Sequence, residues 1–228
     1  GLKGTDGLAG LAAARGALPS AGDRARQALL PLAGSPVRFL TCSGVMGEDE
    51  MQACGMPGYE VVYYPPPVTT ARDTQAACLA FLSAGAGLIV FCGGDGTARD
   101  VAAVTGRSIP VLGIPAGVKM FSAVFVTHPQ VAAAIIRDYP QLPLTEAEVL
   151  DIDEEAYRAG TLISRLYATV MVPSPAGCVQ HGKQVFEEAD EGRALAGIGQ
   201  FLAEVIRATP ATLTLLGPGS TTAAIARA

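Results

Sequence analysis

The sequence has little positive charge and no long apolar run. Of its 228 residues, 16 are lysine or arginine and 21 are aspartate or glutamate, which gives a formal net charge of −5. Nucleic acids and anionic membranes are bound by clustered lysine and arginine, so we expect neither as a partner. Half of the residues are hydrophobic, yet no apolar stretch is long enough to span a bilayer. Any anion that the chain binds must therefore be held by a small local site and not by an extended basic surface.

Cysteine pairs of the disulfide or zinc-binding kind are also missing. The cysteines are scattered, odd in number and form no Cys-x-x-Cys motif; they are Cys42, Cys54, Cys78, Cys92 and Cys178. This usage is typical of reduced thiols, and no charged segment followed by an apolar one opens the chain, so we expect a cytoplasmic protein. Cys178 and His181 have a metal-like spacing without a second pair of ligands. Cys92 is either a nucleophile or a buried small residue.

A glycine-rich corner follows an apolar run of strand length at residues 88–92. A helix is predicted to begin near Thr97, directly after the corner. Glycines at 93, 94 and 96 lack the Cβ atoms that would keep a phosphate from the backbone, and they permit a positive φ. The helix start adds unpaired N–H groups and the positive end of the helix dipole. We therefore predict that Gly93, Gly94, Gly96 and Thr97 bind phosphate or ribose oxygens.

Asp95 lies at the centre of this corner. A carboxylate beside a phosphate is repelled unless it binds Mg²⁺, accepts a proton from a substrate hydroxyl, or does both. That combination is typical of a phosphoryl-transfer site, so we predict Asp95 as a catalytic residue and as a metal ligand. The alternative is a glycine turn followed by an ordinary capped helix.

A second loop is predicted at the same edge of the same sheet. Strands alternate with helices along the first part of the chain, which predicts parallel βαβ units; the strands are expected at 37–41, 60–64, 88–92 and 109–114. Loops at the carboxyl ends of parallel strands converge, so Gly117 and Lys119 are predicted to share a ligand with the corner. Lys119 is either a phosphate contact or a surface lysine on a turn.

The character of the sequence changes after residue 143. An antiparallel hairpin is predicted from strands at 147–153 and 160–172, followed by a helix over 187–207. A strand at 212–216 then leads into another glycine-rich corner. It is either a second anion-binding loop or a plain capped turn, and its candidate binding residues are Gly217, Gly219, Ser220 and Thr221. We predict an α/β domain over 1–143 and a second, incomplete domain over 144–228.

These motifs resemble those of a known enzyme superfamily. Gly93-Gly94-Asp95-Gly96-Thr97 resembles the GGDGT signature of the ATP-NAD kinase superfamily, which also includes diacylglycerol and sphingosine kinases and, more distantly, phosphofructokinases. Residues 113–122 and 216–222 are similar to a predicted ATP-NAD kinase branch that includes acetoin-catabolism-associated proteins. The resemblance implies a Rossmann-like parallel-sheet domain that carries the GGDGT loop, and a second mixed α+β, mainly β domain that covers the dinucleotide.

The resemblance also implies an activity. A kinase of this kind moves a phosphoryl group from ATP, or from polyphosphate, to the 2′-hydroxyl of NAD and so forms NADP, with Mg²⁺ as cofactor. Small-molecule nucleotides would be its partners, and we expect a homo-oligomer, either a dimer or a tetramer. Alternatives are a lipid or other small-molecule kinase of the GGDGT type, a nucleotide-binding regulatory protein without turnover, and a non-enzymatic assembly subunit.

The chain departs from typical NAD kinases at two motifs. Those enzymes carry an Asn-x-Gly-x-x-Gly-Phe segment after the pentad, and later an Asn-Glu or Asn-Asp pair that holds the dinucleotide. Residues 115–121 here read Pro-Ala-Gly-Val-Lys-Met-Phe, and the sequence contains no asparagine. Asp151 and Asp153 stand near the later position, and strand alternation places both on one face. Phosphoryl transfer is thus better supported by the sequence than NAD as the acceptor.

Overall fold

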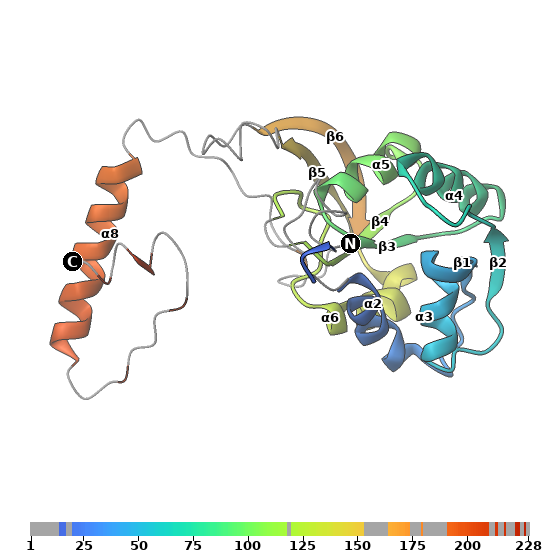
Figure 1. Cartoon of the computed structure of the whole chain (residues 1–228), viewed down its shortest axis with the longest axis horizontal. Coiled ribbons are helices and arrows are strands. Elements are labelled where there is room, and N and C mark those ends of the chain that lie inside the picture. The colour runs from blue at the N-terminus through green and yellow to red at the C-terminus, as the bar shows by residue number, and fades with distance from the viewer. Residues whose placement is uncertain are drawn as a thin grey trace. The chain divides into compact units, whose positions relative to one another are not determined.

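The computed structural model describes part of each of two compact units, residues 1–184 and residues 185–228 (Figure 1). The described residues are 14–16, 20–117, 120–152, 164–173, 179, 191–209, 213, 217, 222–223 and 226. Among them, no helix combines the length and the apolar character that crossing a membrane requires.

The first unit is a mixed α/β structure in which strands and helices alternate. Its helical elements are α2 (Ala21–Leu29), α3 (Glu48–Ala53), α4 (Ala71–Ser83), α5 (Asp95–Thr105) and α6 (Pro129–Asp138), with 3₁₀ turns at Leu30–Leu32, Gly44–Met46 and Tyr139–Gln141. Its strands are β1 (Leu40–Cys42), β2 (Glu60–Tyr63), β3 (Ile89–Gly93), β4 (Val111–Pro115), β5 (Leu144–Ile152) and β6 (Ser164–Pro173). The predicted elements are present here, most of them with bounds shifted by a few residues.

The strand pairs have the predicted directions. β1 pairs with β2, and β3 pairs with β4, both in parallel; Ile89 is opposite Val111 and Gly93 is opposite Pro115. β5 and β6 form the predicted antiparallel hairpin, which begins earlier in the chain than expected. Figure 1 shows α5 lying beside the hairpin and beside β3, so α5 packs against both sheets.

The segment 122–126 joins the parallel pair to the hairpin. Gly113 of β4 donates its N–H to the carbonyl of Val124 at 2.8 Å, and Val126 donates to the Gly113 carbonyl at 2.9 Å. On the hairpin, the carbonyl of Glu148 accepts the N–H of Ala123 at 2.8 Å. The hairpin therefore belongs to the first compact unit, and the boundary near residue 143, which remains a prediction, falls inside that unit.

The core lies between the parallel strands and the helices. Phe125 is fully buried and packs edge-to-face on Phe91, with 5.7 Å between the ring centres. This packing requires glycine at 113, since a Cβ there would stand 2.5 Å from Cδ1 of Phe125. Burial of an aromatic pair of this kind contributes strongly to stability, so β3 and β4 form a firm support for the loops at their carboxyl ends.

Two helices of this unit begin without a side-chain hydrogen bond from the N-cap residue. Ser20 is the N-cap of α2, with Asp23 in the first turn. His128 is the N-cap of α6, and Pro129 occupies the first helical position. Proline fits there since its missing N–H would have no partner in the first turn.

The second unit is described mainly through α8 (Glu191–Ala208), which matches the helix predicted over 187–207. Ile198, Phe201 and Val205 are exposed on it at helical spacing. The strand predicted at 212–216 falls mostly outside the described residues.

Candidate functional site

The glycine-rich corner connects β3 directly to α5. β3 ends at Gly93, Gly94 is the N-cap of α5, and Asp95 is the first helical residue, two residues before the predicted start. Gly94 has an extended backbone, with φ −121°, and neither Gly93 nor Gly96 is among the glycines with positive φ. The positive φ that these glycines permit is therefore not adopted at this corner. An extended N-cap is enough to turn a strand into a helix.

Space, rather than φ, explains part of the glycine pattern. A Cβ on Gly93 would stand 2.5 Å from Oγ1 of Thr97, a distance that forces one of the groups to move. Gly96 is exposed, and within the described part of the chain no heavy atom lies inside 4 Å of a Cβ built on it. Packing thus accounts for Gly93 but leaves Gly96 unexplained, and the predicted contact of Gly96 with a ligand remains a prediction.

The second loop meets this corner, as the parallel arrangement predicts. Ala116 donates its N–H to the carbonyl of Gly93 at 2.9 Å. A Cβ on Gly117 would lie 3.6 Å from the Cα of Gly94, so the two loops come close together at their glycines. Lys119 lies outside the described residues, and its predicted phosphate contact remains a prediction.

The carboxylate of Asp95 accepts two backbone hydrogen bonds from the loop that follows β4. The N–H of Phe121 donates to Oδ2 at 2.8 Å, and the N–H of Ser122 donates to Oδ1 at 2.9 Å. Asp95 is half-buried, which strengthens these charge-assisted bonds relative to bonds in water. Each carboxylate oxygen has two acceptor positions, and within the described ranges each oxygen accepts one hydrogen bond.

The surroundings of Asp95 fit one kind of metal better than another. Across the described ranges, no group of three or more histidine, cysteine, aspartate or glutamate side chains is placed to hold a metal ion. A structural zinc site needs such a group, whereas Mg²⁺ is commonly held by one or two carboxylates together with substrate phosphates and water. Asp95 as a ligand of Mg²⁺ remains a prediction. The Cys178 and His181 spacing falls outside the described residues.

Cys92, directly before the corner, is a structural residue. Its Sγ donates to the carbonyl of Ala21 at 3.2 Å. Burial raises the pKa of this thiol to about 12, so it remains protonated near neutral pH. Since the thiolate is the nucleophilic form, the structure favours the buried-residue interpretation of Cys92.

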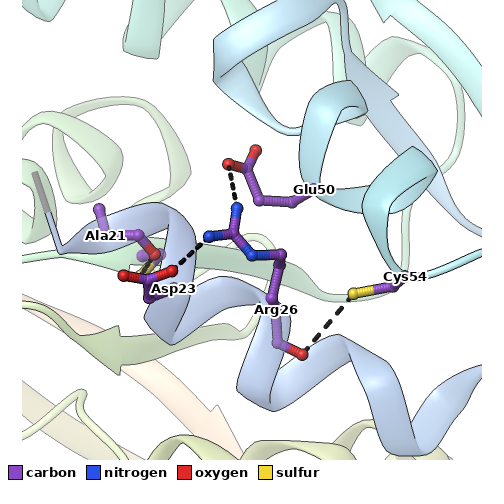
Figure 2. Close-up of polar contacts among 6 residues, drawn as sticks. Ala21, Asp23, Arg26, Glu50 and Cys54 are labelled. Carbon is purple, nitrogen blue, oxygen red and sulfur yellow. Dashed lines mark hydrogen bonds and ion pairs between the residues drawn. The ribbon is translucent and has the colours of Figure 1, made fainter.

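A shallow hollow between α2 and α3 contains none of the predicted site residues. It is lined by Asp23, Arg26, Gln27, Leu30, Ala53 and Cys54. Figure 2 shows that the guanidinium of Arg26 lies between the carboxylates of Asp23 and Glu50, with 3.9 Å to Oε1 of Glu50. Its positive charge is already balanced, so the hollow offers no evident site for an anion.

The late glycine-rich corner is only partly described. The carbonyl of Gly217 accepts a hydrogen bond from Oγ1 of Thr222 at 2.6 Å, as in a local turn. Gly219, Ser220 and Thr221 lie outside the described residues, so their binding role remains a prediction.

Ser122 is the site residue that the sequence did not single out. Its side chain is buried, with 1% of its surface exposed, and its Oγ accepts the N–H of Leu150 at 3.0 Å. The only sequence signal is a hydroxyl residue inside a largely apolar segment, Met120–Val126. The backbone donors to Asp95 leave no signal at all in the pattern of side chains.

Comparison with known proteins identifies a family. No curated protein and no solved structure matches the chain. The family model described as the ATP-NAD kinase N-terminal domain matches residues 15–141, more than half of the chain, and this range includes β3, the corner and α5. The acetoin-associated branch is not distinguished by this match. The chain belongs to the ATP-NAD kinase superfamily.

Proposed function

We propose that this protein transfers a phosphoryl group from ATP, or from polyphosphate, to the 2′-hydroxyl of the adenosine ribose of NAD and so forms NADP. The observation that carries the proposal is the position of Asp95. It is the first residue of α5, at the carboxyl ends of two paired parallel strands, and its carboxylate keeps free acceptor positions. Ligands of open parallel sheets bind at this edge.

Asp95 would act as the proton acceptor. The ribose hydroxyl forms a new bond to the γ-phosphorus as the bond from that phosphorus to the bridging oxygen of ADP breaks, and Asp95 takes the hydroxyl proton. The N–H groups in the first turn of α5, at Gly96 and Thr97, have no carbonyl partner within the helix and would hold phosphate oxygens. When bound, Mg²⁺ would neutralise charge on the transferring phosphoryl group.

Two further loops would supply secondary phosphate contacts. Lys119 would contact a phosphate from the second loop, and the corner at Gly217, Gly219, Ser220 and Thr221 would contact another. The predicted second domain, residues 144–228, would cover the dinucleotide, although its hairpin packs within the first compact unit. We also propose a cytoplasmic homo-oligomer, a dimer or a tetramer.

One observation favours a second candidate, a nucleotide-binding protein without turnover. The two backbone hydrogen bonds to the Asp95 carboxylate hold the loop after β4 against α5. This structural role would explain an aspartate at this position without any catalysis. The two candidates differ in whether removal of the carboxylate affects a chemical step or only the loop.

The test is NADP formation by the full chain with Mg²⁺ and NAD, using ATP and polyphosphate as separate donors. Asp95→Ala is compared with Asp138→Ala, which removes an exposed carboxylate at the end of α6. We expect NADP from the wild type and from Asp138→Ala, and none from Asp95→Ala. Thermal stabilisation by ATP without NADP would support the binding-only candidate. ADP release with a different acceptor would instead identify another small-molecule or lipid kinase.

A further inference from the structure

Ser122 connects Asp95 to the β5–β6 hairpin through two different groups. Its N–H donates to Oδ1 of Asp95 at 2.9 Å, and its hydroxyl oxygen accepts the N–H of Leu150 at 3.0 Å. The residue is 1% exposed, so water does not compete for these bonds. Through its backbone N–H and its hydroxyl, Ser122 thus ties the start of α5 to Leu150 of β5, which lies 28 residues after Ser122.

An irregularity in the hairpin accompanies this link. Val149 is opposite Ala168, but Leu150 is opposite Leu166, so Tyr167 is an extra residue on β6 and the register shifts between Val149 and Leu150. A bulge of this kind disrupts the regular ladder and redirects groups beside it. Here the N–H of Leu150 bonds to the side chain of Ser122.

The neighbouring bond shows how the hydroxyl is used. Ala123, the next residue, donates its N–H to the carbonyl of Glu148, so segment 122–123 runs along β5. Ser122 supplies through its Oγ the acceptor that a backbone carbonyl would supply in a regular strand pair. The hydroxyl therefore fixes the position of its own residue, and with it the two amides that hold Asp95.

We propose that Ser122 is a positioning residue, which holds the Asp95 carboxylate in its reactive orientation by anchoring the Phe121 and Ser122 amides to the bulge at Leu150. The structural link stands on the hydrogen bonds, and its effect on turnover rests on the proposed function. A carboxylate with two rotatable bonds has several rotamers, and two amide donors select one of them. Small misplacements of a reacting group lower rates strongly.

The test of the link is amide hydrogen exchange measured by NMR on the full chain. Ser122→Ala removes the acceptor of Leu150, and we expect both the Leu150 and the Phe121 amides to exchange at least about tenfold faster. Phe121 is the decisive probe because its amide donates to Asp95, whereas the Ser122 hydroxyl accepts from Leu150. Val172→Ala is the control: it removes buried apolar atoms from β6 without altering the link. In that variant, Phe121 should change no more than other core amides.

The test of positioning is kinetic. In Ser122→Ala we expect kcat for NADP formation to fall by about 10²-fold while KM for ATP changes by less than about threefold. Ser122→Cys has a side chain of similar size with a weak acceptor, so its kcat should lie between those of the wild type and Ser122→Ala. If the alanine variant does not fold, the cysteine variant replaces it in the test. Unchanged exchange at Phe121 would overturn the link, even if the wild type made no NADP. Faster exchange with unchanged kcat would overturn the positioning role, and absence of NADP from the wild type would count against the proposed function alone.

Discussion

The side chain of Thr97 packs directly against the Cα of Gly93. A Cβ added to Gly93 would stand 2.5 Å from Oγ1 and 2.7 Å from Cβ of Thr97. These distances are too short for two atoms that are not bonded to each other. Three residues on, Gly96 has no such neighbour among the described atoms within 4 Å. The two glycines therefore serve different purposes, one in the fold of the corner and one at its surface.

Substitution by alanine should separate these purposes. Gly93→Ala overpacks the corner, and we expect it to lower the free energy of unfolding by about 1–3 kcal/mol. Gly96→Ala lies in the first turn of an exposed helix start, so we expect stability to be unchanged or to rise by up to about 1 kcal/mol. Urea unfolding measures both. Nucleotide-induced thermal shifts should be reduced in Gly96→Ala; an undiminished shift would mean that no ligand approaches the backbone there.

The frame of the site could be predicted from the sequence because it depends on local patterns. Apolar runs and glycine corners located β3, β4 and the start of α5 to within about two residues, and parallel topology placed Gly94 near Gly117. The conformation at the corner could not be predicted so well. Glycine is compatible both with positive φ and with close packing, and the choice depends on Thr97, whose contact exists only in the folded chain.

The partners of Asp95 could not be predicted for a different reason. Backbone N–H groups are present at every residue other than proline, so their use at Phe121 and Ser122 leaves no trace in the residue types. The bulge that directs Leu150 toward Ser122 depends on the register of the hairpin. Register is set by side-chain packing across both strands, which sequence spacing alone does not determine.

A second prediction concerns pH and the start of α4. Asp73 accepts bonds from Oγ1 and N–H of Thr70 and from the hydroxyl of Tyr63, which lower the pKa of its carboxyl. The pKa of Asp73 is lower in the folded protein than in the unfolded chain. The carboxylate therefore stabilises the fold fully when the pH is above the ordinary aspartate pKa, and this contribution is lost as the pH falls through the folded-state pKa. We expect Asp73→Asn to be less stable than the wild type at pH 7.

The measurement is urea unfolding of both proteins between pH 7 and about pH 3. The difference in unfolding free energy should shrink as the pH falls below the ordinary aspartate pKa. Tyr63→Phe, which removes one donor and keeps the carboxylate, should show a smaller effect of the same sign. A difference that stays constant with pH would contradict the assignment.

Removal of divalent metal should affect turnover and leave the fold intact. The described residues offer no protein cage for a metal, and Asp95 alone suits Mg²⁺ bound together with phosphates. We therefore expect EDTA to abolish phosphoryl transfer. The unfolding temperature of the nucleotide-free protein should fall by no more than about 1 °C, because a metal that does not bind the folded protein does not stabilise it. A large fall in that temperature would reveal a structural metal.

The central claim is that the Asp95 carboxylate takes part in the chemical step, and kcat of Asp95→Ala tests it most directly. Removal of a proton acceptor should lower kcat for NADP formation by at least about 10²-fold. ATP should still raise the unfolding temperature, since the first-turn amides of α5 remain. A variant that stays folded, binds ATP and forms NADP at the wild-type rate would contradict the account, and Asp95 would then be only the anchor of the loop after β4.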